Sequence, residues 1–126
     1  MTEKQVLLDT NFFLVPYQLG IYIFSELDRI VPTDYTLITL RPLFEELKKL
    51  SKEAKGGDKT AATLGLEFAK GIKVIDSSLN GDDAIIEYAK RNKCIVCTND
   101  SELRKRLKQQ KTPTIFARGK QKLEMG

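Results

Sequence analysis

The feature that most constrains this chain is a regular alternation of short apolar runs with longer segments whose apolar residues recur at helical spacing. The short runs are typical of strands buried on both faces of a parallel sheet. We expect strands at residues 6–8, 36–40, 72–75, 94–97 and 114–117. The alternation predicts an α/β fold, a three-layer α/β/α sandwich around a central, mostly parallel five-stranded sheet.

The helical segments between these strands carry ordinary start and stop signals. Pro42 opens one helix, Asp58 is expected to cap the next, and Gly71 ends it. The predicted helices are residues 21–31, 42–54, 59–70, 82–91 and 101–110, with a short helix or turn at 12–19. The 126 residues contain no linker or repeat, so we expect one domain, 1–126, with a short, mobile basic tail from about residue 118.

The sequence contains no histidine. This excludes Ser-His-Asp and Cys-His catalysis, general acid–base chemistry by histidine, and zinc sites that use histidine ligands. The groups left for chemistry are carboxylates, hydroxyls, amides and lysines.

The two cysteines, Cys94 and Cys97, lie in one predicted strand. Side chains three residues apart on a strand point to opposite faces, so we expect two buried thiols that do not meet. The N-terminal Met-Thr-Glu-Lys-Gln precedes an apolar stretch too short for a signal peptide, and no apolar run reaches membrane-spanning length. Together these features predict a cytoplasmic protein without a membrane partner.

The net charge of +4 conceals two oppositely charged parts. Residues 1–89 carry 10 Lys and Arg against 14 Asp and Glu, whereas residues 90–126 carry 11 against 3. A basic C-terminal third beside a carboxylate-rich remainder suggests a phosphate-bearing partner held next to an acidic site. The alternative is a solvated basic surface helix with no such role.

Acidic residues recur at one place in the predicted fold, the carboxyl end of the sheet. Asp9 follows the first strand, Asp82 opens the helix after the third, and Asp100 follows the fourth. Glu45 and Glu46 lie one turn into the helix after the second strand. Ligands bind beyond the carboxyl ends of parallel strands, so these acids form a candidate site. Clustered carboxylates repel one another, and a hard divalent cation, Mg²⁺ or Mn²⁺, would explain why they gather.

Each acid also has a structural explanation. Asp9 is suited to a turn, and Asp82, Asp83 and Asp100 are common cap or first-turn residues of helices. The Glu45-Glu46 pair alone is compatible with a solvated helix face. Only the recurrence of acids at the same sheet edge favours a site.

Four short motifs, taken in order, resemble those of one known family. They are Leu-Leu-Asp-Thr-Asn-Phe-Phe at residues 7–13, Leu-Phe-Glu-Glu-Leu-Lys-Lys-Leu at 43–50, Gly-Asp-Asp-Ala-Ile-Ile-Glu-Tyr-Ala at 81–89, and Cys-Thr-Asn-Asp-Ser-Glu-Leu at 97–103. The series resembles a PIN domain over essentially the whole chain. That family contains VapC-type toxins and the ribosomal-RNA-processing nucleases of archaea and eukaryotes. Residues 12–29 look closer to the second branch.

The resemblance implies a metal-dependent endoribonuclease that hydrolyses single-stranded RNA. Its acidic set, the catalytic and metal-binding residues, would be Asp9, Glu46, Asp82 and Asp100, with Mg²⁺ or Mn²⁺ as cofactor. Glu46 is preferred to Glu45 because the family's glutamate directly precedes a leucine, and Asp82 is preferred to Asp83 on spacing. Asn11, Thr98 and Asp83 are accessory, the first two orienting a carboxylate or water.

All the acidic positions are filled, which argues against an inactive member of the family. Two roles stay open, ribosomal-RNA processing and a VapC-type toxin, and these imply a ribosome-assembly partner or an antitoxin. The alternative function is a non-catalytic RNA-binding or ribosome-assembly factor that retains the fold.

Substrate phosphates would be repelled by the acids, so basic side chains must offset that repulsion. The candidates for RNA binding are Arg91, Lys93, Arg104, Lys105 and Lys108, with Arg106 among them on the same helix. Helical spacing puts Lys108 on a face with both Arg104 and Lys105. Such contacts hold RNA without reading its bases, and they predict binding that weakens steeply with salt.

Three other classes of protein are disfavoured. A phosphoaspartyl phosphatase needs a second aspartate two residues after the first, where this chain has Asn11. A phosphoacceptor receiver domain needs paired acids before its central aspartate, and only Glu3 precedes Asp9. A P-loop nucleotidase needs a glycine-rich loop ending in Gly-Lys-Ser or Gly-Lys-Thr, and the sequence has none.

The segment of residues 12–23 has more large apolar side chains than one helix stripe can bury. This, with the habit of the family that it resembles, predicts a homodimer. The alternative is that the segment packs only within its own core.

Overall fold

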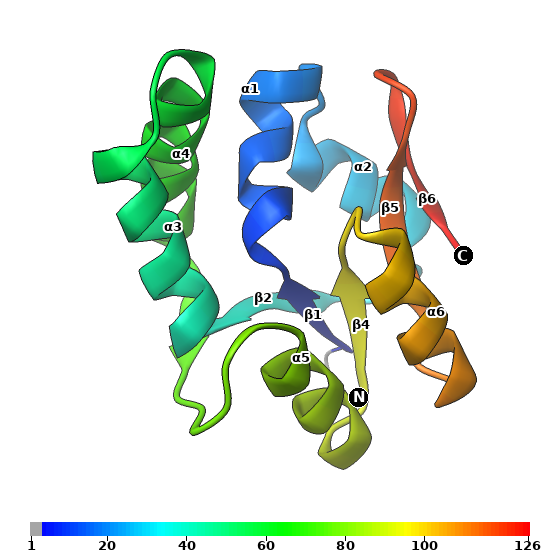
Figure 1. Ribbon diagram of the computed structural model, residues 1–126. Helices are drawn as coiled ribbons and strands as arrows, with labels where there is room; N and C mark the ends of the chain where they lie inside the picture. Colours follow the sequence, from blue (N-terminus) through cyan, green and yellow to red (C-terminus); the bar gives the residue numbers. More distant parts are fainter. Residues whose placement is uncertain (1–3) are drawn as a thin grey trace.

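The computed structural model describes residues 4–126, so residues 1–3 of the N-terminal segment discussed above lie outside it. Six strands form one sheet in the order β3-β2-β1-β4-β5-β6 (Figure 1). They are β1 (Lys4–Leu8), β2 (Tyr35–Leu40), β3 (Lys73–Ile75), β4 (Cys94–Cys97), β5 (Thr114–Arg118) and β6 (Lys122–Met125). The first five strands are parallel, and β6 runs antiparallel to β5. The mostly parallel α/β sheet is confirmed, with all five predicted strands and one more.

The helices follow the predicted order, with small shifts at their ends. They are η1 (Thr10–Leu14), a 3-10 helix, and α1 (Val15–Leu19), α2 (Ile23–Ile30), α3 (Arg41–Glu53), α4 (Gly57–Ala69), α5 (Gly81–Arg91) and α6 (Ser101–Gln109). The predicted short helix at 12–19 is thus two consecutive pieces, η1 and α1. No helix within residues 4–126 combines the length and apolarity that a membrane span requires.

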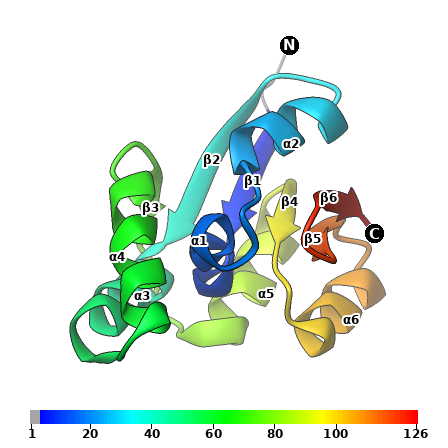
Figure 2. The same cartoon turned by 90° about the horizontal axis from the view of Figure 1, so that it is seen from above.

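Helices cover both faces of the sheet, which gives the predicted three layers (Figures 1 and 2). Successive side chains of β1 serve different faces, because strand residues alternate. Val6 and Leu8 pack with residues of α1, α2 and α4, whereas Leu7 packs with residues of α5 and α6. Helix α3 contributes to both cores, through Leu47 and Leu43 respectively.

The two cysteines lie in β4 and belong to opposite faces of the sheet. Cys94 packs in the core under α5 and α6, and Cys97 packs in the other core. Both are free thiols and buried, as predicted. Burial raises the pKa of Cys94 to about 11, so this thiol stays protonated and unreactive near neutral pH.

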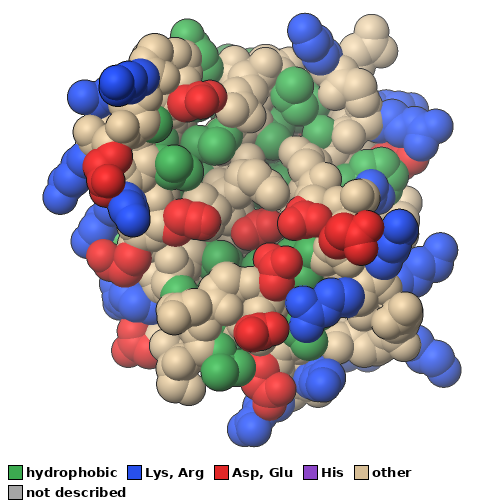
Figure 3. Space-filling model, in the orientation of Figure 1, with side chains coloured by type: hydrophobic (Ala, Val, Ile, Leu, Met, Phe, Trp, Pro, Cys, Tyr) green, Lys and Arg blue, Asp and Glu red, His purple; other side chains and the backbone are tan. Residues whose placement is uncertain are grey.

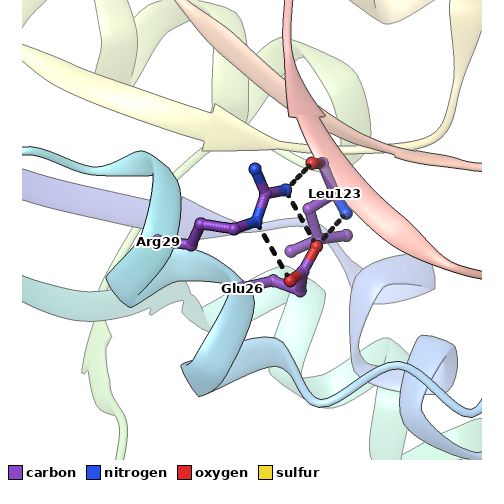
Figure 4. Close-up of polar contacts among 3 residues, drawn as sticks. All are labelled: Glu26, Arg29 and Leu123. Atoms are coloured by element: carbon purple, nitrogen blue, oxygen red, sulfur yellow. Dashed lines mark hydrogen bonds and ion pairs between the residues drawn. The ribbon is translucent and has the colours of Figure 1, made fainter.

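The prediction of a mobile tail from about residue 118 is wrong. Residues 122–125 form β6, and the Leu123 side chain is fully buried in the core. Its backbone is held from α2: Leu123 N donates to Glu26 Oε1 at 2.8 Å, and Arg29 Nη2 donates to Leu123 O at 2.8 Å (Figure 4). The polar composition conceals this strand, because Leu123 is its one buried residue and its attachment comes from pairing with β5 and from the contacts with α2.

Helix α4 begins before the predicted cap. Gly56 occupies the N-cap position with φ 61° and ψ −135°, and Asp58 lies in the first turn instead. A positive φ at this point favours glycine, so the chain turns into the helix at Gly56. Asp58 still lies where the helix dipole favours a negative charge.

The strand order places a crevice at the carboxyl end of the sheet. From β1 the chain proceeds outward to β2 and β3, and then returns to β4 on the other side of β1. In such sheets the segments that leave the two central strands diverge, and ligands bind between them. The residues that follow β1 and β4 therefore line the point where a ligand is expected.

Candidate active site

Asp9 lies directly after β1 and is the most buried acid of the candidate site, with a relative exposure of 7%. One carboxylate oxygen, Oδ1, accepts from Thr10 N at 2.8 Å, and Oδ2 accepts from Thr98 Oγ1 at 2.7 Å. Burial raises the pKa of Asp9 to about 6, and the nearby charges of Asp82 and Glu46 act in the same direction. The two hydrogen bonds oppose this rise without cancelling it.

Thr98 joins the ends of β1 and β4. Its side chain is fully buried, and its hydroxyl donates to Asp9 while accepting from Asp100 N at 3.1 Å. Asp100 in turn caps α6, because its Oδ1 accepts from Glu102 N at 2.9 Å and from Leu103 N at 3.2 Å. Asp9 and Asp100 are thus fixed to one another through a single buried hydroxyl.

Asp82 lies in the first turn of α5. We refer to Glu46, Asp9, Asp82 and Asp100 together as the acidic row. Its pKa is raised, first by burial and then by the charge of Asp100. Since Asp82 also raises the pKa of Asp9, the three carboxylates are near neighbours. Figure 3 shows Asp and Glu side chains gathered in a band across this face, with Lys and Arg on both sides of it.

The members of the two adjacent acidic pairs have different contacts. Glu46 acts electrostatically on Asp9, whereas Glu45 forms an ion pair with Lys48 at 3.1 Å along α3. Asp82 acts electrostatically on Asp9 and is influenced by the charges of Asp100 and Arg106, whereas Asp83 Oδ1 lies 3.5 Å from Arg106 Nη2. Glu46 and Asp82 thus act electrostatically on Asp9, and Glu45 and Asp83 each form an ion pair with a cation. The choice within each pair stays a prediction.

Comparisons with known proteins address the family. A family model described as PIN like domain matches residues 6–120. The chain belongs to the PIN-like domain family. It is 36% identical over 121 residues to ribonuclease VapC4 of Methanocaldococcus jannaschii. This match covers 93% of this chain and 92% of that relative.

Two further likenesses agree with this assignment. The chain is 35% identical over 71 residues to ribonuclease VapC9 of Archaeoglobus fulgidus, a match that covers 56% of this chain and 53% of the relative. The solved structure of the PIN domain endonuclease Utp24 superimposes with a TM-score of 0.76 and 23% identity, over 96% of this chain and 90% of that one. The latter likeness shows that this chain has the PIN fold.

Two asparagines link the loops beside the acids of this PIN-like domain. Asn11 Oδ1 accepts from Asn99 N at 3.4 Å, and Asn99 Oδ1 accepts from Ala117 N at 2.8 Å. The sequence predicts Asn11 as an accessory residue, but it does not identify Asn99 as part of the site. Its signal in the sequence is its place, an exposed amide immediately after Thr98 at the end of a buried strand.

The basic side chains predicted to bind RNA do not lie together in this PIN-like domain. Arg91 ends α5, at the opposite end of that helix from Asp82. Lys93 directly precedes β4, whereas Asp100 follows it, so these two lie at opposite ends of the strand. Arg104 and Lys105 lie in the middle of α6, and Lys108 lies in its last turn. Of the candidates on α6, Arg106 contacts the acidic segment of α5, because its Nη2 lies 3.5 Å from Asp83 Oδ1. Arg104 lies one helical turn after Asp100, and its backbone N donates to Asp100 O.

A divalent metal ion at this site would need donors of suitable chemistry and arrangement. Among residues 4–126, no group of three or more His, Cys, Asp or Glu side chains is already arranged to hold a metal ion. The acids are nonetheless neighbours, all their donors are carboxylate oxygens, and burial beside like charges raises the pKa of both Asp9 and Asp82. Carboxylate oxygens suit Mg²⁺ and Mn²⁺, and a cation among them would offset the mutual repulsion. The type of donor at this site therefore suits such an ion, although the side chains as they lie in residues 4–126 do not form a metal-binding group.

Proposed function

We propose that this PIN-like domain is a metal-dependent ribonuclease that hydrolyses phosphodiester bonds of single-stranded RNA. The observation that carries the proposal is the row Glu46, Asp9, Asp82 and Asp100, built around a buried aspartate at the switch point of the sheet. The two VapC relatives are named ribonucleases, which supports the same activity here.

The chain's own residues have separable tasks in this proposal. Asp9, Glu46, Asp82 and Asp100 would hold Mg²⁺ or Mn²⁺, which supplies an activated water and neutralises charge that develops on the phosphoryl oxygens. Thr98 holds Asp9 in place through its 2.7 Å hydrogen bond. Cationic side chains on α6 offset the repulsion between these carboxylates and the phosphates of the RNA.

The direct test is cleavage of an unstructured RNA oligonucleotide with and without Mn²⁺ or Mg²⁺. Asp9→Asn should lower kcat/KM more than about a hundredfold, because it removes a carboxylate from the centre of the row. Asp58→Asn is the matched control, since it neutralises an exposed aspartate on α4 away from the site. RNA binding without metal-dependent cleavage would favour the non-catalytic RNA-binding or assembly factor.

For the biological role we propose a VapC-type toxin with an antitoxin partner over ribosomal-RNA processing, because both named relatives are VapC proteins. Expression of the wild-type chain alone should arrest growth of a bacterial host, and Asp9→Asn should not. A chain that leaves growth unaffected but trims a ribosomal RNA precursor at one site would support the processing role instead.

We also propose a homodimer. Phe12, Phe13 and Ile23 of the apolar segment are buried in the chain's own core. Other large apolar side chains remain exposed, Tyr17 and Tyr22 within this segment and Phe24 and Leu64 outside it, and Tyr22 is 82% exposed. A dimer through this surface should appear in sedimentation at micromolar concentration and be lost in Tyr22→Lys, and a monomeric wild type would contradict it.

A further inference from the structure

One arginine of this chain differs from the rest in its surroundings. Five of the six arginines form ion pairs with carboxylates: Arg29 with Glu26, Arg41 with Asp76, Arg91 with Glu87, Arg106 with Asp83 and Arg118 with Glu124. Arg104 has no carboxylate partner within residues 4–126. Its neighbour on α6, Lys105, is paired with Glu102 at 3.4 Å. Arg104 is therefore an uncompensated cation on a helix that begins at the acidic row.

Arg104 is also held in a defined orientation. The central carbon of its guanidinium lies 4.0 Å from the centre of the Phe116 ring on β5. Stacking on an aromatic face fixes the guanidinium plane and leaves its edges as donors. The Nε of Arg104 is buried and has no hydrogen-bond partner in the described part of the chain. Because the Nε is enclosed, an incoming phosphate would meet the two Nη groups of the guanidinium instead.

The place of this stack relates it to the acidic row. Arg104 follows Asp100 by four residues, and its backbone N donates to Asp100 O at 3.0 Å, so the two lie one helical turn apart on α6. One turn advances about 5.4 Å, a distance comparable with one nucleotide step along an extended strand. Arg106, two residues further, is instead turned toward Asp83 on α5.

The neighbouring contacts fix β5 against the loop that carries the acids. Phe116 precedes Ala117, whose N is bound by Asn99, and Asn99 lies between Thr98 and Asp100. The ring under Arg104 and the carboxylate of Asp100 are therefore tied to one rigid junction of β4, β5 and α6. A phosphodiester strand leaving the acidic row over this junction would meet the guanidinium.

We propose that Arg104, stacked on Phe116, forms a phosphate-binding subsite for the phosphodiester next to the one at the acidic row. The proposal rests on the proposed function, because it takes the acidic row as the place where RNA is cleaved. Guanidinium edges match phosphate oxygens in bidentate geometry, and no base is read in such a contact. The subsite positions the strand independently of sequence.

Binding is measured first, in the Asp9→Asn background and without metal, with a fluorescent single-stranded RNA oligonucleotide. Adding Arg104→Gln should weaken binding about tenfold or more and reduce the salt dependence by about 0.7 in log Kd per log salt. Arg104→Lys keeps the charge but loses the planar guanidinium, so its affinity for the RNA should lie between those of the Arg104 protein and Arg104→Gln. Lys70→Gln is the control for loss of one charge, because Lys70 lies just before β3 at the far edge of the sheet.

A second variant and a modified RNA distinguish phosphate binding by Arg104 from a purely structural role of this side chain. Phe116→Leu keeps an apolar side chain on β5 but removes the stack, and it should weaken binding in the same direction by a few fold. A methylphosphonate linkage, which is neutral, is then placed at each position of the oligonucleotide in turn. One linkage should weaken binding by the Arg104 protein and have no further effect in Arg104→Gln.

The outcomes separate the two proposals. Equal affinity with and without Arg104→Gln, an identical methylphosphonate profile in both proteins, or no RNA binding at all would overturn the subsite. If binding depends on Arg104 as expected but the wild type cleaves no RNA with Mn²⁺ or Mg²⁺, the subsite stands and the proposed nuclease function fails.

Discussion

Asp9 combines two properties that ordinarily exclude one another, burial and a position among other carboxylates. Its pKa of about 6 lies above the usual 3.8, so the folded protein holds the proton more tightly than the unfolded chain does. The contribution of Asp9 to stability is therefore fully present below about pH 4 and is lost as the pH rises through about 6. Ionised Asp9 lowers the stability of the fold near neutral pH, which indicates that this residue serves the function of the site rather than folding.

Asp9→Asn should remove this pH dependence. In metal-free buffer, the free energy of unfolding of the variant relative to the wild type should rise by about 2 kcal/mol between about pH 4 and pH 7.5. Chemical denaturation at several pH values measures it. A constant difference across that range would show that Asp9 is ionised as readily in the folded as in the unfolded state.

Thr98 is predicted to be a positioning residue. Thr98→Val keeps the shape but removes the hydroxyl that donates to Asp9 and accepts from Asp100 N. RNA cleavage should fall about ten- to a hundredfold, and the acidic limb of its pH profile should move to higher pH, because the hydrogen bond lowers the pKa of Asp9. Thr98→Ser should restore both, and an unshifted profile in the valine variant would contradict the role.

At this scale the sequence was informative about carboxylates and poor about their contacts. Asp9 and Asp100 stand out because each follows an apolar run that can only be a buried strand. Two contacts bring the β4–α6 segment to β5. Asn99 binds Ala117, 18 positions away, and Arg104 stacks on Phe116, 12 positions away. No local pattern marks such contacts, because they depend on which strand lies beside which.

Close packing of whole elements explains one glycine inside a helix. Gly65 lies in α4, where a Cβ would come within 2.8 Å of the Phe13 carbonyl oxygen of η1. Gly65→Ala should destabilise the fold by about 1–3 kcal/mol despite the better helix propensity of alanine. Gly71→Ala, where a Cβ would meet nothing within 4 Å, should change stability by less than about 0.5 kcal/mol. Thermal unfolding compares them, and equal effects would refute the packing explanation.

The attachment of β6 to α2 makes a prediction about local opening. Glu26→Gln keeps the shape of the side chain but removes the charge that holds Arg29 and accepts from Leu123 N. Hydrogen exchange at the Leu123 amide should accelerate about tenfold while the β1 amides keep their protection. Glu67→Gln, which breaks only an exposed ion pair with Lys70, is the control. Unchanged exchange at Leu123 would mean that β5 alone holds the strand.

Strands and helices could be predicted where their apolar pattern is strong. The prediction failed where tertiary contacts determine whether an element forms or where it begins. The buried strands at residues 6–8 and 94–97 could be read directly, because several successive apolar residues leave few other structures. The strand β6 could not, because its segment contains a single buried residue, and its stability comes from β5 and α2. Helix starts were displaced by one or two residues, as at Gly56, where backbone geometry determines the boundary.

For the molecule as a whole, the fold explains how an acidic part and a basic part of one chain meet. The acids come from four segments spread over residues 9–100, and the parallel sheet brings them to one edge. Cationic side chains lie on both sides of the acidic band (Figure 3). A divalent cation would neutralise the acidic band, and an RNA strand would neutralise the cationic side chains beside it. The two together would satisfy the charges of both parts of the surface.

The central claim is that this acidic edge binds the divalent ion, and the location of Mn²⁺ by anomalous diffraction tests it most directly. Crystals soaked in Mn²⁺ should show anomalous density within reach of the carboxylates of Asp9, Asp82 and Asp100, and crystals of Asp9→Asn should show it weakened or absent. Density only elsewhere on the molecule, or none at millimolar Mn²⁺ with these side chains ordered, would contradict the account.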